Sequence, residues 1–141
     1  MAMMSPEERR RFLLDRPRTA KVATVRPDGR PHIAPVWFDL DGEDIVFLTA
    51  ENTVKAANLR ENPHVAVCVE DDTLPYAFVT IEGAATLESS PDTVPGWAKR
   101  IGTRYIGAKQ AELFSRQVAN AGELVVRVTP TRIVAISNVM G

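Results

Sequence analysis

The chain has 141 residues, of which 45% are hydrophobic and 25% are charged. These values are typical of a globular protein, and we expect residues 1–141 to form a single domain with its own core. The net charge of -1 gives no electrostatic reason to expect nucleic acid. No apolar stretch approaches the ~20 residues of a membrane span, and the N-terminal segment lacks the apolar centre of a secretion signal. We therefore expect a cytoplasmic protein that binds neither nucleic acid nor membrane.

The first third of the sequence predicts one helix and then three strands. A capping box at Ser5 starts the helix and Pro17 ends it. Tight turns at Asp28-Gly29 and Asp41-Gly42 separate the strands that follow. Because both turns are short, we expect the strands to form an antiparallel meander. They are predicted over residues 18–26, 32–40 and 45–49.

A short helix and a long helical region are predicted in the rest of the chain. The short helix covers residues 53–61, and Val54, Ala57 and Leu59 are expected to face the sheet. The long region begins near Ser90 and runs to about residue 120. Its interruptions are predicted at Pro95, Gly102 and Gly107.

Four further strands are predicted over residues 64–70, 76–87, 123–128 and 131–137. Gly83 is a candidate for a bulge or a close backbone approach. Cys68 lies in an apolar run and is expected to be a small core residue. About seven mostly antiparallel strands with two or three helices predict a mainly β protein, a small barrel with helices on its outside. Periodicity alone leaves a sandwich as the alternative.

Several kinds of catalytic site have no counterpart in the sequence. His32 and His64 lie outside any metal-ligand spacing and Cys68 has no thiol partner, so we expect no metal site. The carboxylates of residues 39–44 and 70–72 fall at turns and are expected to be solvated. Four residues at helical spacing could line a pocket or a helix face, and we expect a structural role for them: Trp97, Arg100, Arg104 and Tyr105. No residue is predicted to be catalytic.

The segment of residues 47–63 carries the clearest functional signal. A strand ends at Thr49, and a helix begins near Thr53 with Lys55 in its first turn. Free backbone N–H groups and the positive end of the helix dipole favour an anion at such a place. A cation is unfavourable there unless an anion binds beside it. The sequence therefore predicts a phosphate site. The alternative is an amphipathic helix whose lysine lies in solvent.

The same segment resembles a known family. Thr49, Thr53, Lys55, Leu59 and Asn62-Pro63 match the pattern T-x3-[ST]-x-K-x3-L-x2-N-P of the pyridoxamine 5′-phosphate oxidase-like split β-barrel family. The Asp-Gly hairpin, the strand after it and the later Ile-Glu-Gly-Ala-Ala run are also similar to that family. The resemblance covers residues 19–87 well and becomes diffuse beyond them.

The resemblance implies a split β-barrel that forms a homodimer, with two flavin-type cofactors at the subunit interface. Residues 35–38 would run beside the cofactor ring, and residues 48–49 would contact the ring or its ribityl chain. Thr53 and Lys55 would hold the phosphate, and residues 76–78 would come from the partner chain. The implied cofactor-binding residues are Pro35, Val36, Trp37, Phe38, Leu48, Thr49, Thr53, Lys55, Asn58, Tyr76 and Phe78.

Departures from the family pattern bear on which cofactor is bound. Oxidases of pyridoxamine phosphate carry an Arg before the phosphate Lys, where this chain has Val54. They also carry basic residues on the second strand, where this chain has Ile33 and Phe38, and a C-terminal Trp…Arg segment with no counterpart here. The short form is similar to the actinobacterial branch that uses the deazaflavin coenzyme F420. Candidates for a cationic groove along its polyglutamyl tail are Arg60, Arg100, Arg104 and Lys109.

The resemblance thus implies an F420-dependent oxidoreductase acting as a reductase. The reduced deazaflavin would pass a hydride to an electron-poor double bond of a small planar acceptor, with solvent as the source of the product proton. One alternative is an FMN-dependent oxidoreductase of the same fold. Others are a protein that binds a flavin or F420 without catalysis, a haem-binding protein, and a small barrel with no cofactor.

Overall fold

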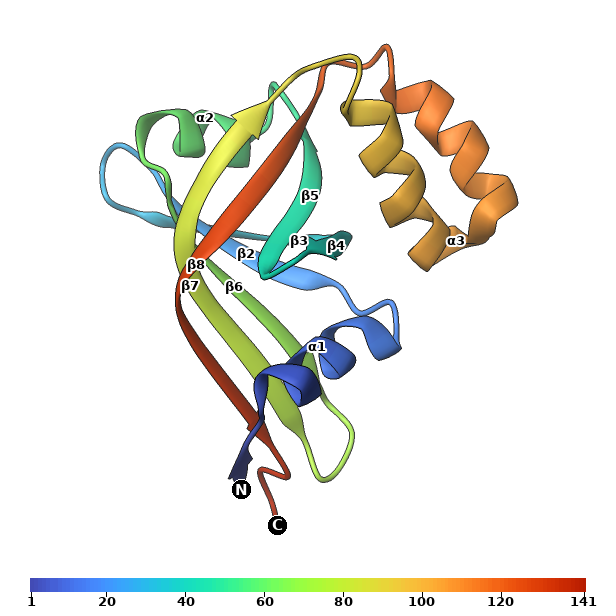
Figure 1. Cartoon of the computed structure of the whole chain (residues 1–141). Coiled ribbons are helices and arrows are strands. Elements are labelled where there is room, and N and C mark those ends of the chain that lie inside the picture. Colours follow the sequence, from blue (N-terminus) through green and yellow to red (C-terminus); the bar gives the residue numbers. More distant parts are fainter.

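A computed structural model describes all residues, 1–141, and shows one curled antiparallel sheet with three helices around it (Figure 1). The helices are α1 (Pro6–Asp15), α2 (Val54–Glu61) and α3 (Val94–Val118). The strands are β1 (Ala2–Met3), β2 (Ala20–Val25), β3 (Pro31–Val36), β4 (Phe38–Asp41), β5 (Asp44–Ala50), β6 (His64–Asp71), β7 (Ala77–Glu88) and β8 (Glu123–Ser137).

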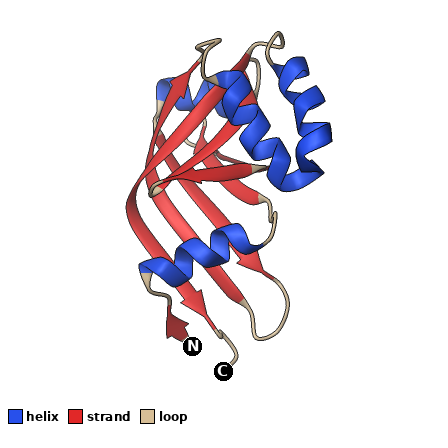
Figure 2. Ribbon diagram, turned by 45° about the vertical axis from the view of Figure 1, so that its right-hand side comes forward, coloured by secondary structure: helices blue, strands red, loops and turns tan.

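The sheet order is β3-β2-β6-β7-β8-β5-β4, with β1 added beside β8. β3 and β4 follow each other in the chain with only Trp37 between them, yet they lie at opposite ends of this order. The sheet must therefore curl until its two ends meet at Trp37, which gives an incompletely closed barrel (Figure 2). The prediction of a barrel is confirmed.

The predicted single strand over residues 32–40 is wrong, and so is the three-strand meander. β3 pairs with β2, whereas β4 pairs with β5. The sequence conceals this change of partner because Val36 and Phe38, on either side of Trp37, are both buried. The alternation typical of one strand thus continues through the crossing point.

The two strands predicted over residues 123–128 and 131–137 form a single strand, β8. Pro130, which suggested a break, lies opposite Gly83 at a shift in the register between β7 and β8. The bulge predicted at Gly83 is confirmed. A Cβ on Gly83 would collide with the carbonyl oxygen of Thr129, so only glycine allows this approach of the two strands.

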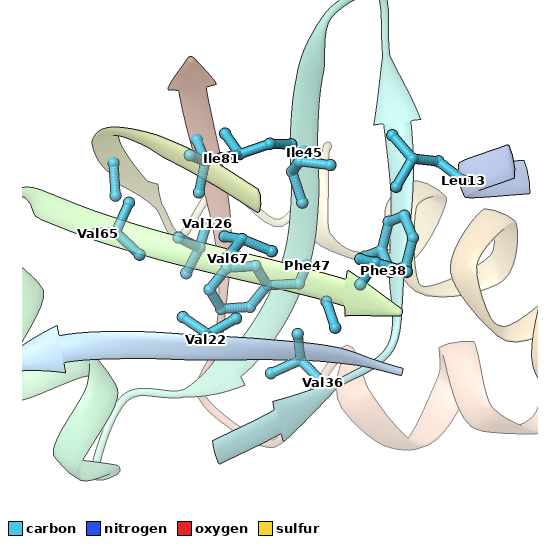
Figure 3. Packing of buried hydrophobic residues seen from close by; sticks show 14 of the residues in the cluster. Leu13, Val22, Val36, Phe38, Ile45, Phe47, Val65, Val67, Ile81 and Val126 are labelled. Atoms are coloured by element: carbon cyan, nitrogen blue, oxygen red, sulfur yellow. The ribbon is translucent and has the colours of Figure 1, made fainter. Parts of the chain in front are cut away.

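The core fills the inside of the curled sheet, and Phe38 and Phe47 are its largest fully buried side chains (Figure 3). Along β6, Val65, Val67 and Val69 point inward and are buried. Cys68 lies on the opposite face of the same strand and is only half-buried. The prediction of a core cysteine is therefore wrong, because the alternation of a strand places it outside.

The start and end signals of the first two helices are confirmed. Ser5 and Glu8 form the predicted capping box of α1, and Thr53 caps α2. The buried face of α2 differs from the prediction: Leu59 is buried, but Val54 and Ala57 are exposed. Ala56 and Asn58 are buried with Leu59, because a buried hydrogen bond of 2.9 Å joins Asn58 Nδ2 to Thr24 Oγ1 on β2.

α3 is a helical hairpin that bends at Gly107, where φ is 82°. The predicted breaks at Pro95 and Gly102 are wrong. Pro95 lies in the first turn, where its missing N–H is tolerated. Gly102 lies where the two halves touch, since a Cβ there would lie 3.1 Å from the Ala111 Cβ. None of the helices is long and apolar enough to cross a membrane.

The close approach at Gly83 makes it the most sensitive glycine of the sheet. We expect Gly83→Ala to lower the free energy of unfolding by about 1–3 kcal/mol, as for other overpacked sites. Gly96→Ala is the matched control, because a Cβ on Gly96 meets nothing within 4 Å and alanine favours a helix. Urea denaturation of both variants measures the difference. Equal stability of the two would contradict the role of the Gly83 contact.

Candidate cofactor-binding site

A hollow beside the Trp37 crossing has a volume of about 470 Å³. It lies where the end of β3, the end of β5, the start of α2 and both halves of α3 come together. Its lining residues are Thr19, Pro35, Val36, Trp37, Leu48, Thr49, Ala50, Thr53, Lys55, Ile101, Phe114 and Glu123. The volume falls within the range of small-molecule and cofactor sites.

One end of the hollow is formed by the start of α2. Thr53 Oγ1 accepts a hydrogen bond of 3.2 Å from the Ala56 N–H and lies 2.8 Å from Thr49 Oγ1. It also donates to the carbonyl oxygen of Ala50 at 2.9 Å. Threonine at the N-cap thus ties the end of β5 to the helix, while the N–H groups of Val54 and Lys55 have no acceptor within the protein.

Lys55 is the only cation that lines this hollow. It is half-buried and makes no hydrogen bond or ion pair with another residue. A lysine in the first turn of a helix opposes the helix dipole, and this one gains no compensation from an acidic neighbour in contact. Free N–H groups, a threonine hydroxyl and an unpaired ammonium therefore converge on one place, which suits a phosphate group.

The other end of the hollow is aromatic. Trp37 stacks on Tyr105 with ring centroids 5.0 Å apart and an angle of 5° between the rings. Phe114, from the second half of α3, lies tilted at 5.7 Å from Trp37. Trp37 and Phe114 form an apolar wall with Ile101 and Val36, and Tyr105 supports this wall from behind Trp37. Such a wall suits a flat ring system and excludes water from one side of it.

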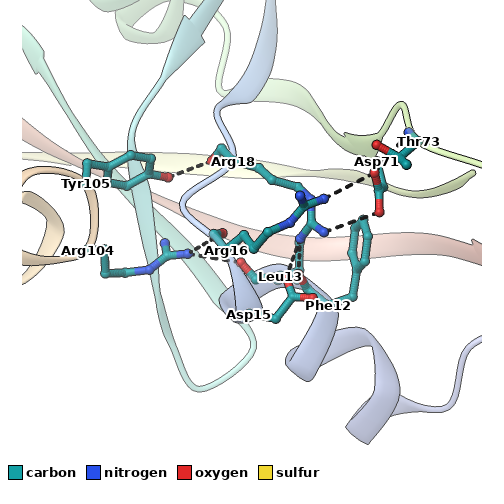
Figure 4. Close-up of polar contacts among 9 residues, drawn as sticks. All are labelled: Phe12, Leu13, Asp15, Arg16, Arg18, Asp71, Thr73, Arg104 and Tyr105. Carbon is teal, nitrogen blue, oxygen red and sulfur yellow. Dashed lines mark hydrogen bonds and ion pairs between the residues drawn. The ribbon is translucent and has the colours of Figure 1, made fainter.

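Tyr105 and Arg104 fix the chain at the crossing point. The Phe38 N–H donates to Tyr105 Oη at 3.1 Å, and Tyr105 Oη donates to the carbonyl oxygen of Arg18 at 2.7 Å. Burial raises the pKa of the Tyr105 phenol, which keeps it a neutral donor. Arg104 donates to the carbonyl oxygen of Phe38. It also donates to the carbonyl oxygen of Leu13 (Figure 4).

A second polar group anchors the segment that leads from α1 into β2 (Figure 4). Arg18 pairs with Asp15 and lies 3.5 Å from a carboxylate oxygen of Asp71. The Thr73 N–H donates to Asp71 at 3.0 Å and, with the charges of Arg16 and Arg18, holds the pKa of the Asp71 carboxyl below its usual range. The linker that ends at Thr19, on the wall of the hollow, is therefore held from both sides.

The structure gathers seven of the eleven predicted cofactor-binding residues at the hollow. They are Pro35, Val36, Trp37, Leu48, Thr49, Thr53 and Lys55. Phe38 and Asn58 are not among them, because both side chains are buried elsewhere. Tyr76 and Phe78 lie near the C-terminal segment, where the Val139 N–H donates to the Tyr76 carbonyl, and they do not line the hollow of their own chain.

The arginines considered for a cationic groove are largely engaged elsewhere. Arg100 donates to the Leu40 carbonyl oxygen at 3.2 Å, and Arg60 donates to the Glu51 carbonyl oxygen at 3.0 Å. Arg104 holds the crossing point. The structural role expected for the group on α3 is therefore confirmed by these contacts.

Sequence reasoning missed some of the lining residues. Ile101 and Phe114 belong to the two halves of α3, and no local pattern shows how a hairpin of helices packs on a sheet. Glu123 begins β8 and lies beside Ala50, the residue after Thr49, through strand pairing. Such a long-range neighbour has no local signal in the sequence.

Comparisons with known proteins show which family has this fold. Residues 5–137 match the family described as Pyridoxamine 5′-phosphate oxidase. The chain belongs to this family. The suspected resemblance and the split-barrel fold are thereby confirmed.

Solved structures with the same fold carry different descriptions. A conserved hypothetical protein of Mycobacterium tuberculosis, Rv2991, is 29% identical with a TM-score of 0.86, over 96% of this chain and 86% of its own. An F420 reductase is 30% identical with a TM-score of 0.71, over 87% of this chain and 94% of its own. HutZ, a haem storage protein of Vibrio cholerae, is 20% identical with a TM-score of 0.72, over 94% and 96% of the two chains, and shows the shared fold alone.

The Tyr105 hydroxyl supports the family's split barrel at its crossing point, and its removal should be costly. We expect Tyr105→Phe to lower the free energy of unfolding by about 1–3 kcal/mol, because the Phe38 N–H and the Arg18 carbonyl lose their partner. Tyr76→Phe is the control, since the Tyr76 hydroxyl makes no hydrogen bond and the residue is 39% exposed. Urea denaturation measures the free energy of unfolding of both variants. An equal loss in both would contradict the role of the Tyr105 hydroxyl at the crossing point.

Proposed function

We propose that this protein is an F420-dependent oxidoreductase that reduces an electron-poor double bond of a small planar acceptor. The observation that carries the proposal is the joining of two features in one hollow. An apolar aromatic wall lies at one end, and the capped start of α2 with an unpaired Lys55 lies at the other. A flat ring linked to a phosphate has these same two parts. The whole chain, residues 1–141, would serve as one cofactor-binding domain.

The lining residues would divide the work between them. Thr53 and Lys55 would hold the phosphate, with Asn58 fixing α2 on β2 from behind. Leu48 and Thr49 would contact the ribityl chain, and the segment 35–37 would border the ring. F420, when bound, supplies the hydride; the protein binds, orients the ring and excludes water. No side chain of the aromatic wall is an acid, so we expect solvent to supply the product proton.

The choice of F420 rests on departures from the oxidases of pyridoxamine phosphate and on one relative. The positions where those oxidases carry basic residues hold Val54 and Ile33 here, which are 45% and 66% exposed. Because both side chains are apolar, neither can offer a cation to a phosphorylated substrate. Phe38 is fully buried in the core. The F420 reductase at 30% identity covers most of both chains, which favours the same cofactor here. FMN is the second candidate, because the same phosphate and ring contacts suit it and the family is described by an oxidase.

We also propose that the protein is a homodimer with a cofactor at each side of its interface. The sheet face opposite the core is apolar around Ile136, which lies between Phe78 and Met3 in neighbouring strands. Met3 is 84% exposed and Ile33 is 66% exposed. A second copy would bury this apolar surface, and could bring Tyr76 and Phe78 to the hollow of the first chain.

The dimer predicts a sharp difference between two exposed apolar residues. Ile33→Lys on the outer face of β3 should shift the protein towards monomer, because a charge would be buried in the interface. Leu113→Lys is the matched control, since Leu113 is 53% exposed on α3 and lies away from that face. Sedimentation equilibrium measures both. A wild-type protein that is monomeric at micromolar concentration would contradict the proposed interface.

A direct titration tests the cofactor and the reaction together. We expect wild-type protein to bind F420 more tightly than FMN, and to oxidise reduced F420 with quinone, enone or nitro acceptors. Lys55→Ala should weaken binding of either phosphorylated cofactor by about 1.5–3 kcal/mol, as for a lost hydrogen bond to a charged group. Lys99→Ala is the control, because Lys99 pairs with Glu112 outside the hollow.

The possible outcomes separate the candidate functions. Tighter binding of FMN, with turnover, would favour the FMN-dependent oxidoreductase. Binding of F420 without turnover across the acceptors would indicate a binding protein. Unchanged affinity of Lys55→Ala would remove Lys55 from the site, and absence of binding to either cofactor would refute the proposed function.

A further inference from the structure

Glu123 lines the hollow, and its carboxylate has no part in the cofactor contacts proposed above. It is the first residue of β8, and strand pairing places it beside Ala50 at the end of β5. A hydrogen bond of 2.9 Å from the Glu51 N–H to the Gly122 carbonyl oxygen fixes the backbone just before it. Glu123 is therefore held on the same half of the hollow as Thr53 and Lys55, close to the place proposed for the phosphate.

The carboxylate of Glu123 has no partner in the protein. It is half-buried, accepts no hydrogen bond and forms no ion pair, not even with Lys55 on the same wall. Burial raises the pKa of its carboxyl, and the charge of Lys55 opposes this rise. A partly desolvated acceptor without a donor is unfavourable, and it gains free energy when a ligand supplies one.

The ligand that satisfies Glu123 must also satisfy Lys55. A bare phosphate would be attracted by Lys55 and repelled by Glu123, so the pair selects a ligand in which hydrogen-bond donors lie next to the phosphate. A polyol chain ending in a phosphate has this order of groups, and both F420 and FMN carry such a chain. Glu123 also lies beside Ala50, which continues the segment 48–49 proposed to contact the chain.

We propose that Glu123 binds the hydroxyl groups of the polyol chain that joins the cofactor ring to its phosphate. This inference rests on the proposed function, because it requires a ring–polyol–phosphate cofactor in the hollow. Lys55 binds the phosphate and Glu123 binds the hydroxyl groups, so the two residues contact different parts of one ligand. Glu123 therefore favours ligands that carry a polyol next to the phosphate over ligands that carry a phosphate alone.

Three ligands of decreasing length separate the two roles. For a protein that binds FMN they are FMN, riboflavin without the phosphate, and lumiflavin without the polyol. For one that binds F420 they are F420, its deazaflavin with the polyol alone, and the bare deazaflavin ring. Glu123→Leu should weaken the first two about 10- to 100-fold and leave the third unchanged. Lys55→Ala should weaken only the first. Fluorescence titration gives all the dissociation constants.

Two further variants control the measurement. Glu51→Leu removes a nearby carboxylate that does not line this hollow, and it should leave all three affinities unchanged. Glu123→Gln keeps the shape and an acceptor oxygen, and it should lie between wild type and Glu123→Leu. Tighter binding of the phosphorylated ligand by Glu123→Leu would show that Glu123 only opposes the phosphate, and would overturn the inference.

The remaining outcomes distinguish a failure of the role proposed for Glu123 from a failure of the proposed cofactor binding. An equal loss for all three ligands would show a general disturbance of the hollow and would overturn the role of Glu123 alone. So would wild-type affinities in Glu123→Leu. A wild-type protein that binds neither cofactor would overturn the proposed function, and the inference with it.

Discussion

The whole site depends on how the backbone of one residue, Phe38, is held. The chain passes at Trp37 from one edge of the sheet to the other, and the strands on its two sides have different partners. Phe38 begins β4, the last strand in the sheet order, so backbone groups on its free edge have no neighbouring strand to satisfy them. Tyr105 and Arg104 take over this role by bonding the N–H and the carbonyl oxygen of Phe38. The barrel closes there because α3 supplies the missing partners.

This arrangement explains why the hollow has an aromatic end. Tyr105, which fixes the Phe38 backbone through its hydroxyl, presents its ring to Trp37 at the same time. The side chain that closes the sheet therefore also supports Trp37, a wall residue of the site. At the other end of the hollow, Thr53 also has two roles, because it caps α2 and joins it to the end of β5 through Thr49 and Ala50. The residues that shape the site are also those that complete the fold.

Sequence reasoning succeeded where a structural signal is local. The capping box at Ser5, the N-cap at Thr53, the turn at Asp28-Gly29 and the bulge at Gly83 each require particular residue types, and all lie where predicted. Thr49, Thr53 and Lys55 lie at one hollow as expected for the same reason, since they are close in sequence. The family resemblance added the aromatic end at residues 35–37.

Errors arose where partners distant in sequence decide the structure. The crossing at Trp37 preserves the alternation of a strand, so no pattern of burial reveals it. Val54 and Ala57 are apolar enough to face a sheet, yet the buried bond between Asn58 and Thr24 turns another side of α2 inward. Ile101, Phe114 and Glu123 reach the hollow through the packing of α3 and the register of β8, which only the complete fold defines.

The position of α3 has a consequence for how proteins of this kind diverge. The hairpin leaves the sheet after β7 and returns at β8, and Glu88 pairs with Val125 across its base. The sheet is thus continuous beneath the excursion, and the register of its strands does not depend on the length of the hairpin beyond Tyr105. Ile101 and Phe114 can change while Thr53 and Lys55 stay in place. The lining residues contributed by α3 and those at the start of α2 can therefore evolve separately, because the first lie on an insertion and the second are held on the sheet.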